Sequence, residues 1–208
     1  MSLRYQNRDR ILQSVTQHLV DHPFEQLSMN AIARASGVSL WALRYNYDNP
    51  DRLFRAVGLR LVEKVVRALD GKPAASAGTF DTIADYARFL ATCVAGKEYR
   101  DLLYFVLRNG QHHRWLCKSY KEAVVDKVCE DLEALVRESG ERHGLTILFR
   151  EGAVRRFHRR IESELALTAM LPSPGEDAPR DVEKVLKEVV SEAFEATYAF
   201  EWRGAAAA

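Results

Sequence analysis

Helical spacing of apolar residues runs through almost the whole chain, and this pattern restricts the fold more than any other feature. In the first such stretch the apolar residues share one face at 100° per residue. They are Ile11, Leu12, Val15 and Leu19. The prolines fall where the pattern breaks, as expected for a residue that interrupts helices. Only the run 145–149 has the composition of a strand. The sequence therefore predicts an all-α protein.

Breaks in the pattern set the ends of the expected helices. Their expected ranges are 7–21, 29–35, 40–47, 50–69, 81–95, 97–109, 113–139, 150–171 and 180–201. Ser28 and Ser39 stand where N-cap residues belong, and Asn49–Pro50–Asp51 has the cap, proline and acid order of a helix start. Gly37 allows a left-handed turn between the second and third helices.

Charge and composition narrow the class of protein. Residues 1–70 hold ten Lys and Arg against seven Asp and Glu, a net charge of +3, and the other 138 residues carry −2. This permits a nucleic-acid partner without requiring one. Three cysteines without CxxC spacing argue against a disulfide framework or a zinc site. Without a long apolar run or a signal-like start, we expect a cytoplasmic protein and no membrane partner.

No catalytic or cofactor-binding motif stands out. Neither a Ser/His/Asp order nor an HExxH, GxGxxG or P-loop pattern occurs. His112 and His113 are adjacent, so they point to different sides of a helix and do not make a metal pair. We expect no enzyme activity, no catalytic residue, no metal and no cofactor.

Residues 28–47 have the order helix, glycine turn, helix, which is typical of the helix-turn-helix motif. In the second of these helices, Leu43 and Tyr47 share the side that can pack inward, and Trp41 and Tyr45 point the opposite way. Large aromatic residues on the outer face of a short helix suggest that the helix meets a partner. The same pattern also occurs as a tight corner in all-α proteins, so the spacing alone leaves both interpretations open.

Residues 8–58 resemble the DNA-binding domain of the TetR family of transcriptional regulators. The matching residues are Ile11, Leu12, Val15, Leu19, Phe24, Ser28, Ile32–Ser39, Leu43, Tyr45–Tyr47, Asp51–Phe54 and Val57. The chain departs from the family pattern at Trp41, where a small residue is usual, at Arg44, where an aromatic is usual, and at Pro50, where lysine is usual. The contacts that family members make with DNA at these positions are therefore expected to differ here.

The resemblance implies a DNA-binding domain at 4–51 and a helical effector-binding and dimerisation domain at 52–203. Arg44, Tyr45 and Asn46 are the main candidates for reading bases, with Trp41 beside them. The full predicted DNA-binding set is Ser28, Asn30, Ser39, Leu40, Trp41, Arg44, Tyr45, Asn46 and Tyr47. Arg4, Arg8 and Arg10 form either a basic arm near the phosphates or solvated charges at the chain's start.

The second domain offers candidates for an effector pocket and for a dimer interface. Aromatic residues and a cysteine could line an apolar pocket, although an ordinary helical core explains each of them as well. The pocket candidates are Tyr86, Phe89, Cys93, Tyr104, Phe105, Trp115 and Tyr120. An apolar stripe on the last helix could pair with its copy in a homodimer or pack inside its own subunit. The stripe consists of Val182, Val185, Leu186, Val189, Ala193 and Thr197.

Together these features predict a one-component DNA-binding transcriptional regulator. The hypothesis is a repressor that binds a palindromic operator as a dimer, because a two-fold dimer places two reading helices about one DNA turn apart. A small-molecule effector would release it. The alternative is an all-α enzyme or sensor in which the helix-turn-helix is only structural.

Overall fold

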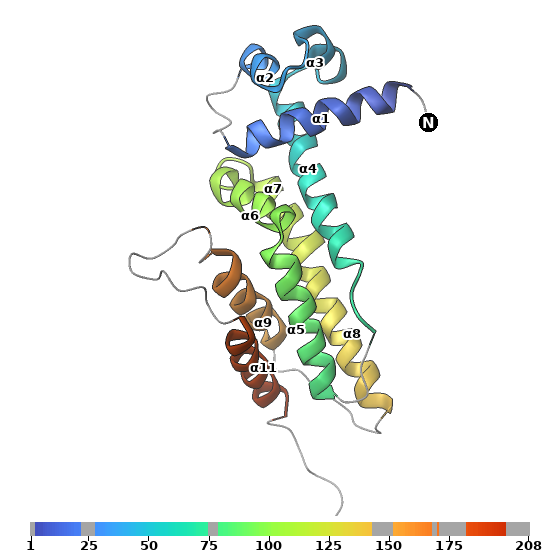
Figure 1. The fold of residues 1–208 in the computed structure, drawn as a ribbon, viewed down its shortest axis with the longest axis vertical. Coiled ribbons are helices and arrows are strands. Elements are labelled where there is room, and N and C mark those ends of the chain that lie inside the picture. The colour runs from blue at the N-terminus through green and yellow to red at the C-terminus, as the bar shows by residue number, and fades with distance from the viewer. Residues whose placement is uncertain are drawn as a thin grey trace, which may run out of the picture. The chain divides into compact units, whose positions relative to one another are not determined.

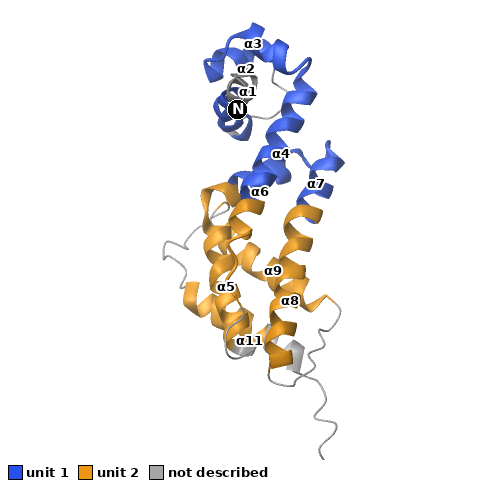
Figure 2. Cartoon of the chain, turned by 90° about the vertical axis from the view of Figure 1, so that its right-hand side faces the viewer, with its two compact units in different colours: residues 1–65, 101–121 blue, residues 66–100, 122–208 orange. Residues whose placement is uncertain are grey.

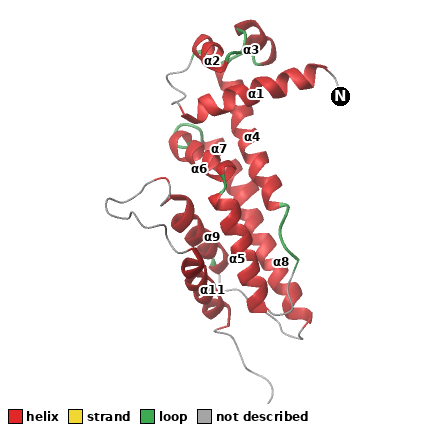
Figure 3. Ribbon diagram, in the orientation of Figure 1, coloured by secondary structure: helices red, strands yellow, loops and turns green. Residues whose placement is uncertain are grey.

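A computed structural model describes residues 3–21, 28–74, 79–142, 152–167, 170 and 182–198. Within these residues the regular structure is helical and contains no strand (Figures 1 and 3). The predicted all-α class is therefore confirmed. The strand-like run 145–149 lies outside the described residues.

The chain forms two compact units, coloured separately in Figure 2. The first comprises residues 1–65 and 101–121, and the second residues 66–100 and 122–208. The boundary between the two packing units thus falls after residue 65, within a helix, and not at residue 51. The two functional domains expected at 4–51 and 52–203 stay a prediction.

The first unit begins with three helices that pack on one another. These are α1 (Leu3–Asp21), α2 (Met29–Ser36) and α3 (Leu40–Asn46). It also takes residues from α4 (Pro50–Leu69), α6 (Lys97–Asn109) and α7 (Arg114–Tyr120). Because α2 and α3 are only eight and seven residues long, packing of their apolar faces rather than helix propensity stabilises them. Val15, Leu19 and Ile32 are buried in this core.

An aromatic cluster forms the other part of the first unit's core. The ring of Phe54 lies 4.8 Å from the ring of Phe105 and 4.4 Å from that of His113, centroid to centroid. The Trp115 ring meets Phe54 edge-on at 6.2 Å, a geometry that aromatic pairs favour. Gly58 lies beside this cluster and leaves the space that the Trp115 ring occupies.

The second unit is a helical bundle. Its helices are α5 (Thr79–Ala95), α8 (Lys127–Arg142), α9 (Ala153–Glu162) and α11 (Val182–Tyr198). Helix α5 contacts the other three, and α9 also contacts α8 and α11. The long expected helices at 113–139 and 150–171 are interrupted by the π-helical segments η2 (Lys121–Asp126) and η3 (Ser163–Leu167). A π-helical turn accommodates an extra residue, and apolar spacing alone does not predict it.

Candidate nucleic-acid interface

Local hydrogen bonds shape the turn between α2 and α3. The Ser28 hydroxyl oxygen accepts a hydrogen bond from the Ala31 N–H at 3.1 Å and caps α2, as predicted. At the other end of α2, Gly37 has a φ of 66°, and the N–H groups of Gly37 and Val38 both donate to the Ala33 carbonyl. The left-handed turn that was expected at Gly37 is therefore present.

Helix α3 is held by a cap and by one buried face. Ser39 caps it by accepting a hydrogen bond from the Ala42 N–H at 3.1 Å. Leu43 and Tyr47 are 0% and 2% exposed. Tyr47 was predicted to contact DNA, and that prediction is wrong for its side chain. It lies four residues after Leu43 and shares the inward face, so the subunit's own core covers it.

The outer face of α3 carries the two aromatic side chains that the sequence predicts there. Trp41 is 73% exposed and Tyr45 is 54% exposed. Their rings stack at a centroid distance of 5.1 Å and an interplanar angle of 11°. Arg44 is exposed on the same helix. Three large side chains thus project from a seven-residue helix whose opposite face packs on the core.

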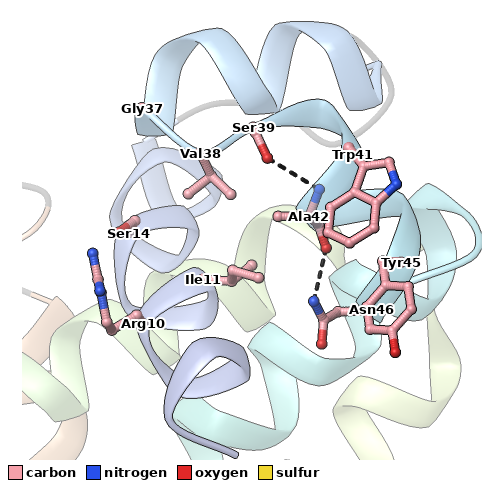
Figure 4. Close-up of a pocket in the computed structure, with 10 residues that line it drawn as sticks. All are labelled: Arg10, Ile11, Ser14, Gly37, Val38, Ser39, Trp41, Ala42, Tyr45 and Asn46. Carbon is pink, nitrogen blue, oxygen red and sulfur yellow. Dashed lines mark hydrogen bonds between the residues drawn. The ribbon is translucent and has the colours of Figure 1, made fainter. Parts of the chain in front are cut away.

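A hollow of about 460 Å³ lies between α1 and this outer face (Figure 4). Arg10 and Ser14 line it from α1, and Trp41, Tyr45 and Asn46 line it from α3. The amide nitrogen of Asn46 donates to the Ala42 carbonyl at 2.8 Å, so part of this predicted base-reading group is engaged within α3. Arg10, which belongs to the expected basic arm, lines the same hollow as the residues of α3. The side chains of Arg4 and Arg8 lie outside the described set.

The other predicted DNA-contacting residues lie near the start of each helix. Ser28 and Asn30 are exposed at the beginning of α2, and Leu40 is half-buried at the beginning of α3. Asn30, Arg34 and Leu40 line a second, shallow hollow that includes the turn. Arg34 was not among the predicted residues, although an exposed arginine inside the motif could have identified it.

The predicted effector-binding residues are divided between the two units. Tyr104, Phe105, Trp115 and Tyr120 belong to the first unit, and Tyr86, Phe89 and Cys93 belong to the second. Phe105 packs in the aromatic cluster, and Tyr104 is exposed.

In the second unit, Tyr86 is fully buried and its hydroxyl donates to the Val128 carbonyl at 3.3 Å. The Phe89 ring lies 5.9 Å from the Tyr86 ring. Burial raises the pKa of the Tyr86 hydroxyl and of the Cys93 thiol. Both groups are therefore neutral near pH 7, and their part in effector binding stays a prediction.

The apolar stripe on α11 packs largely inside its own subunit. Leu186 and Val189 are buried, and α11 contacts α5 and α9. Val185 is half-buried and Val182 is exposed. The side chains of Ala193 and Thr197 lie outside the described set. A partner subunit could cover Val182 and part of Val185, and their role in a dimer stays a prediction.

A buried polar cluster in the second unit has no counterpart in the sequence-based predictions. The Tyr99 hydroxyl lies 2.9 Å from Nε2 of His158 and donates to Glu162 at 2.7 Å. Burial lowers the pKa of His158, and the nearby Glu162 only partly opposes this shift. Because residue 99 and residues 158 and 162 are far apart in sequence, only folding brings them together.

The described part of the chain holds neither a cluster of metal-ligating side chains nor a helix suited to a membrane. It contains no group of three or more His, Cys, Asp or Glu residues arranged to hold a metal ion. None of its helices combines the length and the apolar character needed to span a bilayer.

Comparisons with known proteins place this architecture among solved structures. A scan of protein-family models finds no match, and a search of curated protein sequences finds none either. A TetR family transcriptional regulator from Pseudomonas syringae pv. tomato str. DC3000 superposes with a TM-score of 0.66 at 14% identity, covering 91% of this chain and 95% of that one. A TetR-like transcriptional regulator from Rhodococcus sp. RHA1 gives 0.63 at 18% identity, covering 91% and 94%.

The chain has the fold of the TetR family. The resemblance seen in residues 8–58 is thereby confirmed at the level of fold and extends over most of the chain. A third neighbour is described as the flavonoid-responsive regulator FrrA, with a TM-score of 0.64 at 18% identity and coverage of 91% of this chain and 94% of that one. In all three comparisons the two chains are covered almost completely.

Proposed function

We propose that this chain is a transcriptional regulator that binds duplex DNA through α3. The observation that carries the proposal is the outer face of that helix. Trp41, Arg44 and Tyr45 project from it, whereas Leu43 and Tyr47 hold it on the subunit's core. The TetR fold supports the same assignment, since the Pseudomonas syringae and Rhodococcus neighbours with this fold are described as transcriptional regulators.

The dimensions and chemistry of α3 suit the major groove. Seven residues make a helix about 10 Å long at 1.5 Å per residue, and the major groove of B-DNA is about 12 Å wide. The side chain of Arg44 has no hydrogen-bond or ion-pair partner among the described residues. Its guanidinium can therefore donate two hydrogen bonds to a guanine edge or bind a phosphate.

Hydroxyl and basic groups around the turn can bind the phosphate backbone. The oxygens of Ser28 and Ser39 accept hydrogen bonds from their own helices, which leaves each O–H able to donate to a phosphate. Arg10 and Arg34 are exposed on α1 and α2. Such contacts set the position of the protein on DNA, and the side chains of α3 supply the sequence preference.

The finer functional hypothesis is a homodimeric repressor of a palindromic operator. A two-fold dimer would present two α3 helices to successive major grooves on one face of the DNA. A small-molecule effector acting on the second unit would release the dimer, to the extent that it binds the DNA-free state more tightly. FrrA, which shares the fold, is described as flavonoid-responsive, and this supports an effector for the present chain without specifying one.

Selection of bound fragments from the host's own DNA tests the proposal. The full-length protein should retain specific duplexes, with an affinity that falls steeply as salt rises because phosphate contacts release counterions. The double variant Arg44→Ala, Tyr45→Ala should lose at least about tenfold in affinity, since each base contact contributes about 1–3 kcal/mol.

A matched control is Leu59→Ala with Lys64→Ala, which removes an exposed apolar and an exposed basic side chain from α4. This control should bind as the unaltered protein does. Failure of the unaltered protein to bind any fragment at low salt without effector would refute the proposal and favour an enzyme or sensor. Unchanged affinity of the double variant on α3 would refute α3 as the reading helix.

A further inference from the structure

The surface that α3 offers to DNA is richer in carbon than in hydrogen-bonding groups. Trp41 is the most exposed large hydrophobic residue described in the chain, and Tyr45 is the next. Indole has one N–H donor and the phenol ring one hydroxyl, so most of this surface is apolar. The amide nitrogen of Asn46, which could otherwise bind an adenine edge, donates within the helix to the Ala42 carbonyl.

Stacking fixes this apolar surface before DNA binds. Trp41 and Tyr45 are four residues apart and lie nearly parallel, with ring centroids 5.1 Å apart. They come from successive turns of one side of the helix and project together in Figure 4. Each ring limits the rotamers of the other, so less side-chain entropy is lost when a partner covers the pair.

In the major groove, an apolar surface has one complementary group on unmodified bases. This group is the 5-methyl of thymine, because it is the only alkyl group that the unmodified bases present there; cytosine carries only a hydrogen at the same ring position. We propose that the Trp41–Tyr45 pair reads thymine methyl groups, and that each half-site carries at least one thymine facing this pair. The inference rests on the proposed function and specifies which base chemistry α3 recognises.

Replacing thymine by uracil removes only the methyl group and tests the inference directly. A library of duplexes with a random 30-base-pair centre is prepared with unmodified bases, and the duplexes bound by the full-length protein are selected. In the strongest selected duplex, each position that holds thymine is then tested in turn. Two versions are prepared for that position, one with thymine and one with uracil. Affinities are compared at low salt, where phosphate contacts keep weakened variants on the DNA.

The unaltered protein should bind the uracil duplex about fourfold more weakly for each buried methyl, as expected for burial of one such group. With one methyl in each half-site of a dimer, the loss is about fifteenfold. Trp41→Ala should discriminate between the two duplexes less than the unaltered protein does, because one ring of the stacked pair is gone. Leu107→Ala, which removes an exposed apolar side chain of α6, should keep the full discrimination.

Each remaining outcome overturns a stated part of the reasoning. Binding of thymine and uracil duplexes within twofold by the unaltered protein would overturn methyl recognition and leave DNA binding intact. Undiminished discrimination in Trp41→Ala would show that a residue outside the stacked pair or the shape of the DNA is responsible, and would overturn the assignment to the stacked pair. If the library yields no bound duplex, the proposed function itself fails.

Discussion

Substitution of Gly37 measures how strongly the turn before α3 depends on a left-handed backbone. Gly37 has a φ of 66°, and a Cβ atom built on it meets no atom within 4 Å. Gly37→Ala therefore creates no steric clash with neighbouring groups. The expected cost is the backbone strain of an L-residue in this conformation, about 1–2 kcal/mol.

Thermal unfolding followed by circular dichroism is the assay for this prediction. For a chain of this size, about 1 kcal/mol lowers the midpoint by about 2–4 °C, so Gly37→Ala should lower it by about 2–8 °C. Gly37→Asn is the matched control, because asparagine tolerates the left-handed region better than alanine does. Its midpoint should lie closer to that of the unaltered protein.

Equal midpoints for Gly37→Ala and the unaltered protein would refute the reasoning. They would mean that the turn relaxes to a negative φ at no cost, and that Gly37 does not set the geometry between α2 and α3. Duplex binding measured on the same variants shows whether a strained turn also moves the reading helix.

The remaining predictions concern a packing contact, a helix cap and a buried histidine. Gly58→Ala should destabilise the protein by about 1 kcal/mol, because its Cβ would lie 2.8 Å from the Trp115 ring and the overpacking exceeds the gain in helix propensity. In a Trp115→Leu background the same change should stabilise the protein, and chemical unfolding measures both effects. Ser39→Ala should cost about 1 kcal/mol in the same assay by removing the α3 cap, and Ser39→Asp should restore stability yet weaken duplex binding through its charge. The lowered pKa of His158 means that the unfolded chain binds the proton first. Stability should therefore fall as the pH drops below about 6.5, by up to about 1.4 kcal/mol per pH unit. The stability of His158→Gln should depend less on pH. An identical slope in that variant would contradict the assignment of this pH dependence to His158.

Local patterns in the sequence were sufficient to predict the helical fold and the interface motif. Apolar spacing predicted α3 and its exposed aromatic pair, because helix geometry alone decides which side chains share a face. Caps and turns follow from nearby residues in the same way, and the hydroxyl of Ser39 and the φ of Gly37 confirm them. The resemblance to the TetR family that the sequence shows rests on residues 8–58, which include this motif.

Contacts between distant parts of the chain could not be predicted in this way. The inward face of α3 was visible in the spacing, yet Tyr47 was still included among the DNA-contacting residues, and its 2% exposure settles where its side chain lies. The division of the predicted effector-binding aromatics between two units depends on which helices pack together. Local spacing shows which face of a helix is apolar, but not which other segment covers that face. Burial of Leu186 within the subunit, the π-helical segments and the cluster of Tyr99 with His158 were therefore decided by tertiary packing alone.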